Sequence, residues 1–310
     1  MHDSLPNPSD PSPPQPAAVA ALLRRAARAG EAPWLHREIA RRMTERLGWI
    51  KRRPARVLDW WSVQGGSLAA LREALPRSRI DAVEPSAALR DAARAMRRSP
   101  WWSMRRWTQE AGDAWLEGEA PADGAAQLLW SNMALHWAPD PAALFARWRR
   151  ALAVDGFVMF SCFGPDTLRE LRTLHRHRGW GASGHGFIDM HDLGDMLVAA
   201  GFADPVMDME ALQLHWADAA SMLAELRTLG GNAAATRFAG LRTPRWRRGF
   251  VEATAATLAG ADGRPALGFE IVYGHAFVPA ARLKVEPEVR VSADALRRMA
   301  RAGASGSALP

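Results

Sequence analysis

The feature that most constrains the fold is a short apolar strand pattern that runs into an acidic residue and then into a glycine turn. Val57 and Leu58 lead into Asp59, and Gly65 and Gly66 then open a helical pattern. Nucleotide-binding βαβ units begin in this way, because the backbone of the turn must approach a ligand closely. Residues 55–75 therefore predict the first strand, turn and helix of a ligand-binding α/β sheet.

Strand and helix patterns alternate through the first half of the chain. An unbroken apolar run at 157–163 is typical of a strand that is buried on both faces of a parallel sheet. The alternation predicts a doubly wound, Rossmann-like α/β fold. The expected strands are 55–61, 79–84, 104–108, 126–131 and 157–163, and the expected helices between them are 67–75, 86–96 and 141–152.

Further segments extend this domain at both ends. Helical patterns at 17–29 and 34–49 precede the first strand and predict an N-terminal helical cap. The second half predicts helices at 165–175, 189–200, 221–229 and 244–258 and strands at 206–214 and 267–278. We expect one domain over residues 17–278, a disordered proline-rich leader at 1–16 and a basic C-terminal tail at 279–310.

The charge balance limits the classes of partner. The net charge of +7 is carried almost entirely by arginine, which suits an acidic partner, although a compositional bias of the genome would give the same balance. The chain has no recognition helix or aromatic-basic stacking motif, so we do not expect nucleic acid as a partner. Cys162 is the only cysteine, and no apolar run approaches the roughly 20 residues that span a bilayer. We therefore expect a cytoplasmic protein without a membrane partner.

Three polar residues are candidates for contacts with a nucleotide cofactor. Glu84 ends the second expected strand, where its carboxylate can accept hydrogen bonds from ribose hydroxyls or, alternatively, cap the next helix. Asp113 follows the third expected strand and can accept from an adenine amino group or simply hold a turn. Asn132 ends the fourth expected strand, at the edge where open α/β sheets bind ligands.

Several enzyme classes lack their motifs in this chain. It contains no hydride-transfer fingerprint Gly-x-Gly-x-x-Gly, no P-loop, no kinase motif set and no Gly-x-Ser-x-Gly elbow. His136 lies beside Trp137, and a lone histidine in such a place is more often packed than catalytic. The other histidines lack the regular spacing of metal ligands, so we expect no metal site.

Four segments resemble the malonyl-acyl-carrier-protein O-methyltransferases of biotin synthesis, which are class I S-adenosylmethionine-dependent methyltransferases. The segments are SNMALHW at 131–137, FGPDTLREL at 163–171, DMHDLGD at 189–195 and VYGHA at 272–276. The resemblance extends from about residue 34 to residue 278, in order and at sensible spacing. The arginine-hydroxylating assembly factors of respiratory complex I are the alternative relatives, and they are similar to parts of the first two segments.

The resemblance implies a fold and a cofactor. The fold is a seven-stranded sheet whose last strand, 267–278, is antiparallel, and the cofactor is S-adenosyl-L-methionine. By the same match Asp59 and Gly65 would face the methionine end of the cofactor, Glu84 would hold the ribose and Asp113 the adenine. Helices at 164–175 and 189–200 would roof the acceptor site.

The resemblance also implies a reaction and a partner. The reaction is methylation of the free carboxylate of a malonyl thioester, presented by an acidic acyl-carrier protein or as malonyl-CoA. Since that carboxylate is already ionised at pH 7, the reaction needs orientation of the acceptor rather than a general base. The candidates for orienting it are Tyr273, His275, Arg169 and His191, each of which could instead serve packing or surface solvation.

The glycine turn departs from the pattern of this family. Aligned on Asp59, Trp61 and Val63 stand where the first two glycines of the family loop belong, and only Gly65 is kept. Glycine at these positions permits unusual backbone angles and close approach to the ligand. A tryptophan side chain could fill the space of the methionine moiety, so the alternative hypothesis is a methyltransferase-like pseudoenzyme or scaffold that no longer binds the cofactor.

Overall fold

The computed structural model describes residues 13–98, 112–119, 121, 123–260, 262–280, 293–294 and 297. The leader expected at 1–16 and the tail expected at 279–310 lie largely outside the described residues, and the strand expected at 104–108 lies outside them altogether. Contacts within the chain divide it into one unit of residues 1–279 and a second unit of residues 280–310. The fold described below is that of the first unit.

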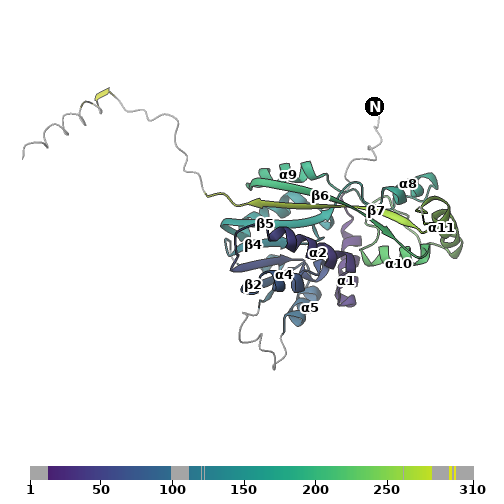
Figure 1. The fold of residues 1–310 in the computed structure, drawn as a ribbon, viewed down its shortest axis with the longest axis horizontal. Helices are drawn as coiled ribbons and strands as arrows, with labels where there is room; N and C mark the ends of the chain where they lie inside the picture. The colour runs from purple at the N-terminus through teal and green to yellow at the C-terminus, as the bar shows by residue number, and fades with distance from the viewer. Residues whose placement is uncertain are drawn as a thin grey trace, which may run out of the picture. The chain divides into compact units, whose positions relative to one another are not determined.

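A seven-stranded sheet with the strand order β3-β2-β1-β4-β5-β7-β6 forms the centre of the fold (Figure 1). β7 runs antiparallel to both β5 and β6, whereas β1 to β5 run parallel to one another. The expected Rossmann-like sheet with an antiparallel last strand is therefore confirmed. The strands are β1 (Arg56–Trp60), β2 (Arg79–Glu84), β3 (Ala114–Leu116), β4 (Ala126–Ser131), β5 (Leu152–Phe163), β6 (Ala203–His215) and β7 (Ala266–Phe277).

Helices precede, connect and extend the sheet, and Figure 1 shows α8, α10 and α11 gathered at one end of β6 and β7. α1 (Pro16–Ala29) and α2 (Trp34–Leu47) form the expected N-terminal cap. No helix within the described ranges has the length and apolar character needed to cross a membrane. The other helices are α3 (Ser62–Gly65), α4 (Leu68–Ala74), α5 (Ala87–Arg97), α7 (Pro141–Ala151), α8 (Arg169–His177), α9 (Met190–Ala199), α10 (Ala219–Thr228) and α11 (Pro244–Thr257).

Local sequence signals explain where several of these helices begin. Ser86 accepts a hydrogen bond from the Leu89 amide at the start of α5, and Asp140 accepts one from the Ala143 amide at the start of α7. Such side chains satisfy backbone N–H groups that have no partner in the first turn of a helix. The helix starts therefore follow from capping residues that the sequence places directly after a strand or turn.

Two elements at the carboxyl edge of the sheet differ from expectation. Residues 62–65 form the short helix α3 rather than an open turn, and Trp61 before it adopts a left-handed backbone with φ 57° and ψ 48°. β3 begins after Asp113 instead of ending before it, because residues 114–116 are the ones that pair with residues 82–84 of β2. Asp113 therefore precedes β3, and Glu117 is the acidic residue that follows it.

A cluster of aromatic rings fills the core beneath α7. The ring of Phe145 lies 5.4 Å from that of Trp148 and 5.5 Å from that of Phe160, and Trp148 also contacts Trp60 of β1. Phe145, Trp148 and Phe160 have no measurable exposed surface. The cluster joins α7 to β1 and β5 and so fixes the position of both strands.

We expect Phe145→Ala to lower the free energy of unfolding by about 3–5 kcal/mol, since it leaves a cavity among packed rings. Chemical denaturation measures this loss. Arg150→Ala, on the exposed side of the same helix, is the matched control and should change stability by no more than about 0.5 kcal/mol. Equal losses for the two variants would contradict the assignment of this cluster to the core.

Candidate functional site

The polar residues predicted at the cofactor edge of the sheet lie at the carboxyl ends of neighbouring strands. β1 lies between β2 and β4, so Asp59, Glu84 and Asn132 come from three adjacent strand ends or the turns that follow them. Ligands of open α/β sheets bind at this edge, where the strand order reverses. All three side chains are fully buried.

Asn132 ties the glycine turn to the rest of the fold. Its side-chain amide donates to the carbonyl oxygen of Gly65 at 2.6 Å and to that of His36 in α2 at 2.8 Å, and its oxygen accepts from the Ser161 hydroxyl at 2.7 Å. A Cβ atom on Gly65 would lie only 2.9 Å from the Asn132 carbonyl oxygen, so this glycine is required by close packing. The turn after β1 is therefore held against β4, β5 and α2.

Glu84 and Asp59 belong to a buried network with Arg97 of α5. The Val63 amide donates to one carboxylate oxygen of Glu84 at 2.9 Å, and the other oxygen, Oε2, has no hydrogen-bond partner among the described residues. Arg97 is 3% exposed; it donates to the Ser62 hydroxyl at 2.9 Å and lies 3.7 Å from Oδ2 of Asp59. Arg97 was not identified from the sequence, where it reads as one more arginine at the end of a basic helix.

Burial raises the pKa of both carboxyl groups. The pKa of Glu84 rises to about 8, chiefly because its ionised form loses hydration, while the hydrogen bond from Val63 opposes the shift. The pKa of Asp59 rises to about 6 for the same main reason, with Arg97 opposing it. At neutral pH Glu84 is therefore mostly protonated, and Asp59 and Arg97 form the ion pair.

Trp61 extends across this edge of the sheet toward β3. Its indole N–H donates to Oε1 of Glu117 at 2.5 Å, and Oε2 of Glu117 accepts from Arg147 of α7 at 2.9 Å. Asp113, expected at the adenine, lies at the start of β3, with Arg94 at 3.3 Å and its own carboxylate accepting from the Ala114 amide. The structure thus brings Asp59, Gly65, Glu84 and Asn132 together at the carboxyl edge and places Asp113 apart from them.

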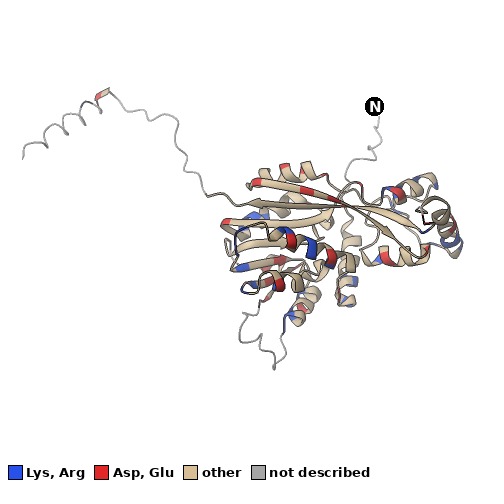
Figure 2. Ribbon diagram, in the orientation of Figure 1, with Lys and Arg blue, Asp and Glu red and all other residues tan. Residues whose placement is uncertain are grey.

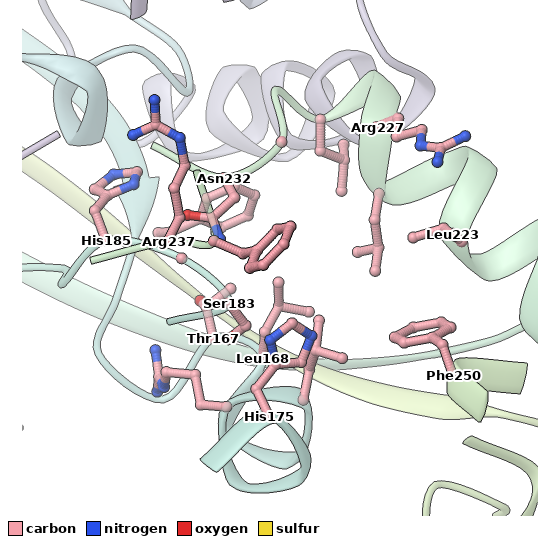
Figure 3. A pocket seen from close by; sticks show the side chains of 18 of the residues that line it. Thr167, Leu168, His175, Ser183, His185, Leu223, Arg227, Asn232, Arg237 and Phe250 are labelled. Atoms are coloured by element: carbon pink, nitrogen blue, oxygen red, sulfur yellow. The ribbon is translucent and has the colours of Figure 1, made fainter. Parts of the chain in front are cut away.

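A mostly apolar cavity of about 290 Å³ lies next to this edge, under α8, α10 and α11. Phe163 at the end of β5 and Trp137 after β4 form its wall toward the sheet. Figure 3 shows Thr167, Leu168 and His175 on one side of the cavity and Leu223 and Arg227 on the other. Its size and lining suit the acyl part of a small ligand.

Four arginines border this cavity: Arg172, Arg227, Arg237 and Arg242. None of the four forms an ion pair with an acidic residue in the described part of the chain. Arg172 is half-buried and donates to the Pro165 carbonyl, and burial lowers its pKa. Arg242 stacks over the rings of Phe238 and Trp246 at 4.1 and 4.5 Å. Apolar walls with unneutralised cations at the rim favour an anionic ligand with an apolar portion.

The four residues predicted to orient an acceptor do not come together. Tyr273 and His275 line a different cavity beside α2, where the Tyr273 hydroxyl donates to Glu210 at 3.1 Å and Arg46 lies 3.8 Å over its ring. Arg169 is exposed and 3.6 Å from Asp166, and His191 is exposed at the start of α9 beside Asp189. None of these four side chains lines the cavity bordered by arginines.

Two histidines lie at the wall of the arginine-bordered cavity: His185 lines it, and His136 packs on its lining residues Trp137 and Phe163. His136 is buried among the rings of Trp137, Phe163 and His185, and burial lowers its pKa well below the usual value. His185 donates from Nε2 to the His136 carbonyl at 2.8 Å, which leaves its Nδ1 as an acceptor without a partner among the described residues. Both rings are therefore neutral packing groups at pH 7.

We expect the free energy of unfolding to fall as pH rises from about 5 to 9, by on the order of 4 kcal/mol, because the unfolded chain releases the Glu84 proton near pH 4.5 and the folded chain only near pH 8. Glu84→Gln should remove most of this decline. Denaturation at pH 5, 7 and 9 measures it, with the exposed Glu73→Gln as the control that keeps the wild-type decline. An unchanged decline in Glu84→Gln would contradict the burial of this carboxyl group.

Comparison with known proteins identifies the family from the sequence and finds the same fold in solved structures. A methyltransferase-domain family model matches residues 32–204. Two solved structures share the fold: the YcgJ protein from Bacillus subtilis, with a TM-score of 0.52 and 12% identity over 77% of this chain and 98% of that one, and a methyltransferase from Bacillus halodurans, with a TM-score of 0.53 and 14% identity over 77% and 99%.

Curated relatives are more similar in sequence. The malonyl-[acyl-carrier protein] O-methyltransferase of Laribacter hongkongensis is 39% identical over 85% of this chain and 89% of its own length. That of Gallionella capsiferriformans is 37% identical over 80% of this chain and 86% of its own. That of Nitrosospira multiformis is 39% identical over 84% of this chain and 88% of its own length. The chain therefore belongs to the malonyl-[acyl-carrier protein] O-methyltransferase family of methyltransferases.

Proposed function

We propose that this protein is a methyltransferase that esterifies the free carboxylate of a malonyl thioester carried by an acyl-carrier protein, as a step in biotin biosynthesis. The observation that supports this best is the arginine-bordered cavity at the carboxyl edge of the sheet, in a chain whose relatives carry this activity in their names. No observation in the described residues favours the alternative relatives, the arginine-hydroxylating assembly factors of respiratory complex I.

The cavity can accept both parts of the acceptor. A malonyl group has a short apolar portion and one free carboxylate, and its thioester end continues into a long flexible arm. The apolar lining formed by residues such as Leu171, Leu223 and Phe250 would hold the arm and the methylene, and the half-buried Arg172 would pair with the carboxylate. Because that carboxylate is ionised at neutral pH, the contribution of these residues is orientation and exclusion of water rather than proton transfer.

The methyl donor that we propose for this family is S-adenosyl-L-methionine. By the family match Asp59, Gly65, Glu84 and Asn132 would hold it. In the described conformation these side chains and the turn bond to one another, so the cofactor does not fit between them. The part of the site that is open in this conformation is the arginine-bordered cavity, where we place the acceptor.

The surface charge supports an anionic carrier as the partner. Figure 2 shows positive and negative residues interspersed on the same helices, so the net charge is not confined to one element. On α11, however, Arg245, Arg247 and Arg248 are exposed beside the cavity-lining Trp246 and Phe250. An acidic acyl-carrier protein could dock there by charge complementarity, and malonyl-CoA is the smaller anionic alternative. A carrier of this kind would place the protein in the cytoplasm.

Arg172→Gln should raise KM for the malonyl acceptor by about 10-fold or more, because it removes a half-buried cation that lines the apolar cavity. The measurement is transfer of a labelled methyl group to malonyl carrier protein over a range of acceptor concentrations. Arg169→Gln, three residues earlier on the same helix but exposed and outside the cavity, is the matched control and should leave KM unchanged. Equal effects of the two substitutions would contradict this acceptor site.

A further inference from the structure

We propose that this chain closes its own cofactor site. The indole of Trp61 lies where the adenosine of S-adenosylmethionine would bind, and the α3 turn is hydrogen-bonded to the Glu84 carboxylate that would hold the ribose. The inference rests on the proposed function, since it concerns access to the cofactor site of that reaction. Four observations carry it, and they come from different elements of the fold.

The first observation is the path of the Trp61 side chain. Trp61 follows β1, where its backbone amide donates to the Val83 carbonyl of β2 at 2.7 Å, and its indole N–H reaches Glu117 just after β3. In the strand order β3-β2-β1, β2 lies between these two points. The indole therefore crosses the end of β2, which is where an acidic residue such as Glu84 would meet the ribose of a bound nucleotide.

The direction of this side chain refines the expectation from the sequence. The alternative drawn from the sequence has a tryptophan that could fill the space of the methionine moiety, whereas the indole points toward β3 and so toward the adenosine side. Trp61 also keeps the left-handed backbone that favours glycine, with φ 57°. The backbone of the turn thus keeps a conformation suited to glycine while its side chain takes up space beside the turn.

The second observation is that the ribose-binding carboxylate is engaged by the protein itself. The Val63 amide donates to Glu84 at 2.9 Å, so α3 has folded onto the carboxylate rather than leaving it open. Oε2 of Glu84 is buried without a hydrogen-bond partner in the described part of the chain, as is Oδ1 of Asp59. Buried polar atoms in proteins are nearly always paired, so these two atoms mark a site shaped for further partners.

The third observation is the charge balance of the closed site. S-adenosylmethionine brings positive charge on its sulfonium and ammonium groups, and a site that holds it needs carboxylates. Here Arg97, itself 3% exposed, lies 3.7 Å from Asp59 and bonds to Ser62 in the α3 turn. Arg97 therefore supplies the positive charge that faces Asp59 of β1, and the closed site needs no bound cation.

The fourth observation is the cover formed by α1. Leu23, Ala26 and Ala27 of α1 pack on the small apolar cluster that contains Val63 of the turn and Leu89 of α5. α1 also borders a groove that shares Arg227, Asn232 and Arg237 with the arginine-bordered cavity. Helix α1 thus lies over the cofactor site and beside the arginine-bordered cavity. Its displacement would open the cofactor site toward that cavity.

Closure of the site predicts how tightly the protein binds the cofactor. When only a fraction of molecules is open, the apparent Kd for the cofactor rises by the inverse of that fraction. Removing the indole should therefore tighten binding even though a bulky contact surface is lost. A tryptophan that lined an open site would show the opposite, since its removal would weaken binding.

Calorimetric titration of the full chain with S-adenosylhomocysteine tests this claim. We expect Trp61→Gly to bind at least 10-fold more tightly than the wild type, and the exposed Trp49→Gly, at the end of α2, to bind like the wild type. Equal measurable affinity of Trp61→Gly and wild type would overturn the closure and leave the proposed function intact. Absence of binding by both at millimolar ligand would overturn the closure and the proposed function together.

A second variant and a ligand-free measurement guard against misfolding of Trp61→Gly. Glu117→Gln keeps the indole but removes the charged acceptor of its N–H, and it should also tighten binding, by a smaller factor. In the wild type without ligand, the Trp61 indole proton in the NMR spectrum should exchange slowly with solvent. Rapid exchange of this proton would overturn the closure, whatever the affinities.

Discussion

The hydrogen bond from the Val63 amide to Glu84 is the contact on which the arrangement of the carboxyl edge depends. It draws the turn after β1 down onto the end of β2 and so defines α3. With the turn in this position, Asn132 can bridge the carbonyls of Gly65 and His36, and Arg97 can reach Ser62 and Asp59. Each of these contacts satisfies a polar group that would otherwise be buried alone, which would cost about 1–3 kcal/mol. The closed turn is therefore one cooperative unit.

The two sides of the site are in different states. On the acceptor side a cavity of about 290 Å³ has apolar walls and four arginines without acidic partners among the described residues. On the cofactor side the carboxylates are buried, and α1 packs on the apolar cluster that contains Val63 of the turn. His136 and His185 are neutral, packed rings at the wall of that cavity. The fold of the family is thus complete and the arginine-bordered cavity is open, whereas we propose that the protein's own groups close the cofactor side.

The sequence predicts the sheet well because strand burial and capping are local properties. β4 was expected at the residues where it lies, and the antiparallel β7 follows from the family resemblance. Asp59, Gly65, Glu84 and Asn132 lie at one edge of the sheet, since parallel strands bring their carboxyl ends together, and their role toward the cofactor stays a prediction. The strand expected before Asp113 lies outside the described residues, and the described strand β3 begins after Asp113, at three residues that carry no strand pattern of their own. Arg97, Glu117 and the path of the Trp61 indole depend on contacts between distant segments, which no local pattern encodes.

Hydrogen–deuterium exchange at the Val63 amide of the full chain tests the closed turn most directly. We expect this amide to be strongly protected without ligand and to exchange faster with saturating S-adenosylhomocysteine, because the α3 turn must move away from Glu84 to admit the ribose. An amide that exchanges freely without ligand, or one whose exchange slows when the ligand binds, would contradict the account.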